Sequence, residues 1–284
     1  MIQYRGDSLN YEDRFSQKHI VLFSLLIGII FVVVFGYFGT MFFSMIMPQI
    51  LLSIPGINYF PPIFSNFIAF LFLILLIKKI DLYYDIPWNF NGVFKGLLLG
   101  STLIIFTLLQ MFLIFLNSPD KTIVISIIPM VNTIIFCISI GLWEETLCRG
   151  ILLTNMLKKW GKTKKGIITS IIFSSLIFGG LHIITALNGN LINSLIQVVY
   201  ASIMGMFLST IYIKTKSLWS VIVLHIILNF SAYSMPFLMP FSVGINQVMF
   251  LLILLIFNTL WLILIYVMLY KIDSLDIEEL LLFN

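Results

Sequence analysis

Two glutamates and an arginine lie close together in a strongly apolar part of this sequence. In the segment GLWEETLCRG, Glu144 and Glu145 are adjacent, and Arg149 follows four residues after Glu145. A carboxylate that no cation neutralises can take a proton from water, which is the chemistry of a general base. The question is therefore which of the two glutamates has a partner.

Helical spacing separates the two glutamates. Glu145 and Arg149 stand at positions i and i+4, so they share one face of a helix and can neutralise each other. Glu144 points about 100° away, since an α-helix has 3.6 residues per turn, and it has no cation on its own face. We predict a structural ion pair of Glu145 with Arg149, and we expect Glu144 to face a cavity.

Two histidines and an asparagine lie in later apolar segments. His225 and Asn229 have i,i+4 spacing, as do Phe178 and His182. A carboxylate with an imidazole can deprotonate water for attack on an amide carbonyl, and a second imidazole with an amide NH2 can stabilise the resulting oxyanion. Two histidines and a glutamate are also adequate zinc ligands, although no HExxH motif is present. The residues alone leave a metal-dependent reaction open.

The composition of the chain indicates what must position these residues. Of its 284 residues 60% are hydrophobic and 10% are charged, against about 25% charged in typical soluble proteins. A soluble domain of this length could not bury so much apolar surface. We predict an all-α, multi-pass protein of the cell membrane. Its net charge of +4 is ascribed to loops that face one leaflet, not to nucleic-acid binding.

Eight apolar segments are long enough to cross about 30 Å of hydrocarbon as helices. They cover residues 20–45, 62–77, 93–117, 123–157, 166–187, 191–213, 217–240 and 246–270. Four prolines in residues 47–62 argue against a regular helix between the first two spans. No internal repeat is evident, so residues 20–271 are expected to form one membrane domain.

The distribution of lysine and arginine gives an orientation. With eight spans, fourteen of the sixteen lysines and arginines fall on one side, Arg149 lies inside a span, and Lys121 lies on the other side. The positive-inside rule then places both termini in the cytoplasm. Residues 1–19 and 272–284 would be cytoplasmic, and the acidic C-terminal tail is expected to be a solvated end.

The expected depths bring the polar side chains together. At 1.5 Å per residue from the cytoplasmic ends of their spans, Glu144 lies roughly 21 Å deep, His182 roughly 24 Å, His225 roughly 12 Å and Asn229 roughly 18 Å. A charge at the bilayer centre costs at least about 2.5–3.5 kcal/mol, so such residues are candidates for function and face the bundle interior. We expect the fourth, fifth and seventh spans to build one site. Other polar residues in spans are interpreted as packing residues: Asn132, Asn193, Gln197 and Asn258.

Three motifs follow one another along these spans. EETLCR begins at Glu144, FGGLH at Phe178 and HIILN at His225. In this order they resemble the EExxxR, FxxxH and HxxxN motifs of the CAAX protease and bacteriocin-processing (CPBP, or Abi) family of intramembrane endopeptidases. The resemblance covers about residues 140–230, and it implies a catalytic core of about residues 123–240.

The resemblance implies a role for each motif residue. The general base would be Glu144, the second water-activating group His182, and the oxyanion-stabilising pair His225 and Asn229. The supporting residues would be Glu145, Arg149 and Phe178. The family is commonly labelled metalloprotease. We favour a metal-free mechanism; a divalent metal such as zinc, if bound, would be held by Glu144, His182 and His225.

The function expected from the resemblance is hydrolysis of a peptide bond in a peptide or membrane-associated protein that reaches the cavity from the cytoplasmic side. The composition looks bacterial, and for bacterial relatives leader-peptide or peptide-pheromone maturation, bacteriocin immunity and virulence regulation are the suggested processes. The alternative is a non-catalytic membrane scaffold that regulates a partner protein; the completeness of the three motifs favours catalysis. A proton-coupled transporter would have inverted repeats, and none is evident. The sequence predicts no oligomeric state.

Overall fold

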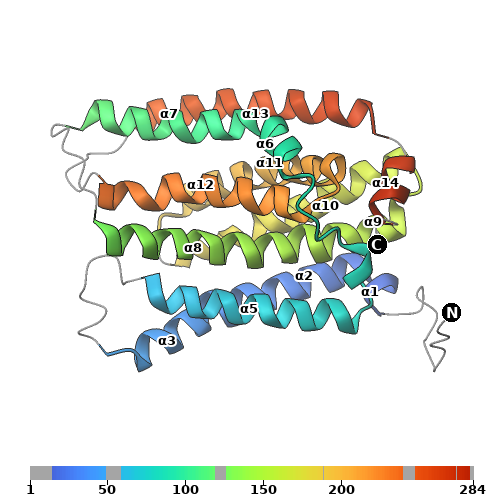
Figure 1. The fold of residues 1–284 in the computed structure, drawn as a ribbon, viewed down its shortest axis with the longest axis horizontal. Coiled ribbons are helices and arrows are strands. Elements are labelled where there is room, and N and C mark those ends of the chain that lie inside the picture. Colours follow the sequence, from blue (N-terminus) through green and yellow to red (C-terminus); the bar gives the residue numbers. More distant parts are fainter. Residues whose placement is uncertain are drawn as a thin grey trace.

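A computed structural model describes residues 15–48, 59–118, 126–187, 189–238, 247–272 and 274–281. These residues form helices joined by short connections, with no strand among them, which confirms the all-α prediction. Figure 1 shows long helices running roughly side by side along the longest axis. Residues 1–14, Lys121 and most of the proline-containing stretch 47–62 lie outside the described ranges.

The long helices correspond to the predicted spans. In chain order they are α2 (Ile20–Phe31) with the π-helix η2 (Val32–Gly39) and α3 (Thr40–Ile46), α5 (Phe60–Lys79), α8 (Ile127–Glu145) with the π-helix η5 (Thr146–Leu153) and α9 (Thr154–Trp160), α10 (Lys164–Leu181), α11 (Leu191–Thr215), α12 (Leu218–Leu238) and α13 (Gln247–Tyr270). Shorter elements are α1 (Phe15–Lys18), the 3₁₀ helices η4 (Tyr83–Asp85) and η6 (His182–Leu187), α6 (Val93–Leu99), α7 (Ser101–Asn117) and α14 (Ser274–Leu281).

The third predicted span, residues 93–117, is broken. By length and composition, seven of the described helices could cross a membrane, and an eighth span exists only if α6 and α7 count as one, although they are bent by 63°. The break falls at Gly100, where an added Cβ would lie 2.6 Å from the Leu224 side chain of α12. Glycine permits this close approach, and its low helix propensity favours a break at the same residue.

Prolines mark the start of α5. This helix begins at Phe60, with Pro61 and Pro62 in its first turn, where backbone amides have no helical partner in any case. The prediction that residues 47–62 contain no regular helix is therefore wrong for the last three of them. Residues 49–58 lie outside the described part of the chain.

One end of the bundle carries the lysines of the described chain. We name it the lysine-rich end; it holds Lys18, Lys78, Lys79, Lys95, Lys158, Lys159, Lys162, Lys164, Lys165, Lys214, Lys216 and Lys271. The short helices α9 and α14 lie here, at the right of Figure 1. We name the opposite end, where α3 ends and α5 and α8 begin, the far end.

Short elements close the lysine-rich end. Lys158 pairs with Asp85 at 2.5 Å, and Lys214 pairs with Asp276 of α14 at 3.3 Å. On α14, Ile277 and Leu280 are buried. The acidic tail is therefore not a solvated end over this helix, because its apolar face packs on the bundle and its Asp276 pairs with Lys214.

Two adjacent glycines in α10 have different environments and give a matched test of packing. A Cβ on Gly179 would come 2.7 Å from the Val198 carbonyl oxygen of α11, whereas a Cβ on Gly180 would meet nothing within 4 Å. We expect Gly179→Ala to destabilise the protein by about 1–3 kcal/mol, because the backbone of α11 would have to move. Gly180→Ala should be neutral or slightly stabilising, since alanine favours helix. Thermal unfolding in detergent measures both, and equal midpoints would contradict this account.

Candidate active site

The EETLCR motif lies at the point where α8 changes into the π-helix η5. Glu144 and Glu145 end the α-helical part, and Arg149 lies in the wider turns that follow. The Thr154 hydroxyl donates to the Arg149 carbonyl oxygen at 2.8 Å. π-Helical turns inside α-helices occur frequently at functional sites, because they redirect side chains. Here the wider turn surrounds the charged motif.

The predicted ion pair is present and fully buried. Arg149 Nη1 donates to Glu145 Oε1 at 2.7 Å, and neither side chain is more than 1% exposed. Arg149 Nη2 donates to the Gly205 carbonyl oxygen of α11 at 2.9 Å. The Arg149 guanidinium also lies 5.0 Å from the centre of the Phe178 ring of α10, which is within cation–π range. The pair therefore ties α8 to α10 and α11.

Glu145 has a second partner, which sequence spacing did not predict. Its Oε1 lies 2.6 Å from His225 Nδ1 of α12. An ionised carboxylate only accepts hydrogen bonds, so the proton lies on Nδ1 and the imidazole donates. This contact fixes the orientation of the ring, and His225 Nε2 then lies 3.7 Å from Glu144 Oε2.

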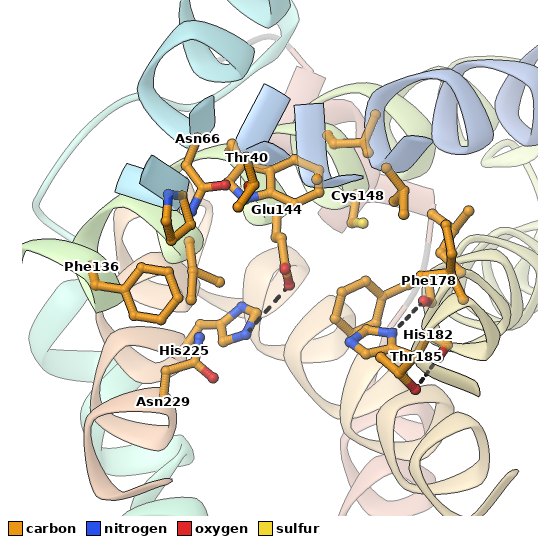
Figure 2. Close-up of a pocket in the computed structure, with 18 of the residues that line it drawn as sticks. Thr40, Asn66, Phe136, Glu144, Cys148, Phe178, His182, Thr185, His225 and Asn229 are labelled. Carbon is orange, nitrogen blue, oxygen red and sulfur yellow. Dashed lines mark hydrogen bonds and ion pairs between the residues drawn. The ribbon is translucent and has the colours of Figure 1, made fainter. Parts of the chain in front are cut away.

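The two glutamates differ in their access to water. The Glu144 side chain is 19% exposed, while that of Glu145 is 0% exposed. Glu144 lines a cavity of about 360 Å³ together with His182, His225 and Asn229. Figure 2 shows His225 and Asn229 on one side of this cavity and His182 on the other, with the Glu144 carboxylate between them in this view. The expected convergence of the fourth, fifth and seventh spans is thus present.

His182 occupies a different local structure from the one predicted. The apolar segment 166–187 predicts a regular helix, but α10 ends at Leu181 and His182 begins the 3₁₀ helix η6. His182 Nδ1 lies 3.0 Å from the Phe178 carbonyl oxygen, so Nδ1 carries a proton and donates it. In the neutral imidazole this leaves Nε2 as an acceptor, which suits a group that accepts a hydrogen bond from water.

The Phe178 ring packs against other residues of the site. Its ring centre is 5.0 Å from that of His182 and 6.2 Å from that of His225, both in edge-on geometry. With the Arg149 guanidinium also beside it, one aromatic ring touches three polar groups of the site. The supporting role expected for this residue is consistent with these contacts.

Several polar groups around the cavity were not predicted as site residues. Trp143 Nε1 is buried and has no hydrogen-bond partner among the described residues, as is also true of Nδ2 of the predicted site residue Asn229. Gln197, which was interpreted as a packing residue, lines the cavity and accepts from Thr185 Oγ1 at 3.2 Å. In the sequence, Gln197 could have been recognised as a site residue because it is a polar side chain in an apolar span. Trp143 could not, because it resembles the other apolar residues of its helix.

The fit of a metal ion was tested on the donor set. Among the described residues, no group of three His, Cys, Asp or Glu side chains converges closely enough to hold a metal ion. The set named from the resemblance, Glu144, His182 and His225, does not form a three-ligand site in this arrangement.

The comparisons with known proteins agree with the geometry. Residues 126–231 match the family model described as Type II CAAX prenyl endopeptidase Rce1-like. Comparisons with curated proteins and with solved structures gave no match. The matched range contains all three motifs, which confirms the resemblance they indicated. Over residues 126–231 the chain is therefore similar to the Rce1-like CAAX prenyl endopeptidases, a family of membrane-embedded proteases.

Proposed function

We propose that the protein is an intramembrane endopeptidase in which Glu144 activates a water molecule for attack on a peptide bond. One observation carries the proposal. A partly exposed carboxylate lies in a cavity beside imidazole and amide groups from two other helices, while its neighbour Glu145 is fully buried and paired. Among the described residues no lysine or arginine pairs with Glu144, and an intramembrane carboxylate is costly, so a role in chemistry explains its presence.

The reaction follows from the donors and acceptors around the cavity. Glu144 takes a proton from water as the water oxygen forms a bond to the peptide carbonyl carbon. His182 Nε2 accepts a hydrogen bond from the same water and orients it. When the tetrahedral intermediate collapses, the C–N bond breaks and the leaving nitrogen receives the proton that Glu144 holds. The products are a new carboxyl group and a new amine.

The developing oxyanion would be stabilised by His225 and Asn229. Asn229 Nδ2 is a donor with no partner among the described residues, so a substrate oxygen would satisfy it. His225 Nδ1 donates to Glu145, so donation from Nε2 as well requires the imidazolium, whose charge the carboxylates on both sides would compensate. Loss of one such donor lowers kcat by about 10²–10³-fold in well-studied cases.

The substrate would be a peptide or a membrane-associated protein. The match to CAAX-type endopeptidases supports a peptide bond as the target. Among the processes suggested by the resemblance, we propose leader-peptide or peptide-pheromone maturation, bacteriocin immunity or virulence regulation. The scaffold alternative remains an outcome of the experiment that follows.

The test compares new peptide termini in host membranes that contain the wild type or one of four variants at equal protein level. The variants are Glu144→Ala, His182→Ala, His225→Ala and Asn229→Ala. We expect a set of membrane peptides to gain new termini only with the wild type, and each new carboxyl group to carry one heavy oxygen when the cells grow in ¹⁸O-labelled water. The same termini and the same phenotype in all four variants would contradict the protease and favour the scaffold.

A further inference from the structure

The catalytic cavity extends in one direction along the bundle. Phe136 lines it eight residues before Glu144 on α8, and Tyr233 lines it eight residues after His225 on α12. Eight helical residues rise about 12 Å, so both lie well towards the far end. Pro62, in the first turn of α5, also contributes. The lining thus runs from the catalytic layer to the far end.

Towards the lysine-rich end, the interior of the bundle is filled by buried side chains. Every residue from Glu145 to Leu157 is buried, over about 18 Å of helix at 1.5 Å per residue. The neighbouring helices supply fully buried side chains at these levels: Ile167, Ile171, Ile211, Tyr212, Leu218 and Val221. Beyond them, α9, α14 and the lysine ion pairs close the lysine-rich end. Close packing leaves a peptide no route from this side.

Two further cavities lie on the same side of the catalytic layer. One of about 290 Å³ shares His182, His225 and Asn229 with the first cavity. Another, of about 510 Å³, adjoins the 290 Å³ cavity through Asn193 and Phe250, and its lining residue Gln247 begins α13 at the far end. Part of the lining of each cavity thus lies between the catalytic residues and the far end.

The lining of the first cavity indicates what it can accept. Among the described residues that line it, Glu144 is the single carboxylate, and lysine and arginine are absent. Towards the far end the walls are aromatic: Tyr59 stacks on Phe136 at 4.4 Å, and Tyr233 packs edge-on against Phe136 at 5.0 Å. An uncharged substrate segment would enter without loss of ionic hydration, whereas a charged one would find no counter-ion.

We infer that the substrate is an uncharged, largely apolar peptide segment that reaches Glu144 from the far end of the bundle. By the predicted positive-inside orientation this is the extracytoplasmic side, so the cleaved bond lies in a segment presented there. This inference differs from the expectation of entry from the cytoplasmic side. This inference rests on the proposed function for the identity of the ligand, but its geometry can be tested without catalysis.

Thiol accessibility gives the test. In a background with Cys137→Ala and Cys148→Ala, single cysteines are placed in the cavity as Thr40→Cys and Tyr233→Cys, in full-length protein in the host membrane. We expect a membrane-impermeant thiol reagent to modify both in intact cells. After that treatment, labelling by a permeant reagent should be lost. In sealed inside-out vesicles the impermeant reagent should leave both unmodified.

Three control positions make every outcome informative. Lys162→Cys and Gln247→Cys lie exposed at the lysine-rich and far ends, so they report orientation and reagent activity. Ser170→Cys is fully buried on the lysine-rich side of His182 and should stay unmodified from both faces. Modification of the cavity positions from the same side as Lys162→Cys, or from neither side while the exposed controls react, would overturn the inference.

The substrate class is tested separately on a cleaved peptide found in the host membranes. Lys or Asp at the residues that flank the cleavage site should abolish cleavage, whereas Leu or Phe at the same residues should retain it. Equal cleavage of all four peptides would contradict the inference that the substrate is uncharged and apolar. Failure of Glu144→Ala to stop cleavage would refute the proposed function, while the cysteine pattern would be unaffected. The two failures are therefore distinguishable.

Discussion

Glu144→Gln is expected to lower kcat for peptide hydrolysis by about 10²–10⁴-fold, the usual contribution of a positioned general base. The amide has nearly the same shape as the carboxylate, but it cannot take a proton from water. Because the Glu144 side chain is partly exposed and pairs with no lysine or arginine among the described residues, the fold should be unaffected. The measurement is the initial rate on a cleaved peptide, with protein reconstituted in lipid, beside the thermal midpoint.

The matched control is Glu145→Gln. This change removes the charge that balances the buried Arg149 and alters the acceptor of His225 Nδ1, so it should lower the thermal midpoint as well as the rate. Glu144→Gln should lower the rate alone. If Glu144→Gln kept full activity while Glu145→Gln lost it at an unchanged midpoint, the two glutamates would have exchanged the roles assigned here.

The parts of this site that the sequence predicts are those set by helix period and membrane thickness. The Glu145–Arg149 pair follows from i,i+4 spacing, and the convergence of Glu144, His182 and His225 follows from their depths in three spans. Both are seen in the structure. The span boundaries follow from hydropathy for the same reason, because about 20 apolar residues are needed to cross the bilayer.

The parts that the sequence does not predict depend on contacts between helices. The bend at Gly100 arises where α6 and α7 approach Leu224, and nothing in residues 93–117 alone indicates that approach. The contact of Glu145 with His225 joins residues 80 positions apart. The i,i+4 spacing to Arg149 already accounted for the charge of Glu145, so the sequence offers no reason to expect a second partner. The ion pair predicted for Glu145 is present, but it is one of two contacts that this carboxylate makes.

The direction in which the cavity extends also depends on how the side chains of neighbouring helices pack. Charge distribution gives the side of each loop, but it does not show where side chains leave space. The expectation of cytoplasmic entry came with the resemblance and stays a prediction. In the structure, residues such as Ile151 and Leu153, each 0% exposed, fill the lysine-rich half of the bundle. The empty volume inside a helical bundle depends on how the side chains of neighbouring helices fit together. The hydrophobic periodicity of a single segment does not show this.

Arg149→Met is expected to destabilise the protein by about 3–5 kcal/mol, the range observed when one partner of a buried ion pair is removed. Methionine fills much of the same space, so the loss comes from the carboxylate of Glu145, which would remain at 0% exposure without its cation. The Gly205 carbonyl oxygen would also lose its donor. Denaturant unfolding in mixed micelles measures the change in the free energy of unfolding.

The double variant Glu145→Gln/Arg149→Met separates charge from packing. When both charges are removed, the cost of an uncompensated buried charge disappears, so the double variant should be more stable than Arg149→Met alone. Its activity should nevertheless stay low, because a glutamine orients His225 less firmly than a carboxylate that accepts from Nδ1. If the double variant were as unstable as the two single changes added together, the Glu145–Arg149 pair would not be coupled, and the stability of this region would rest on helix packing alone.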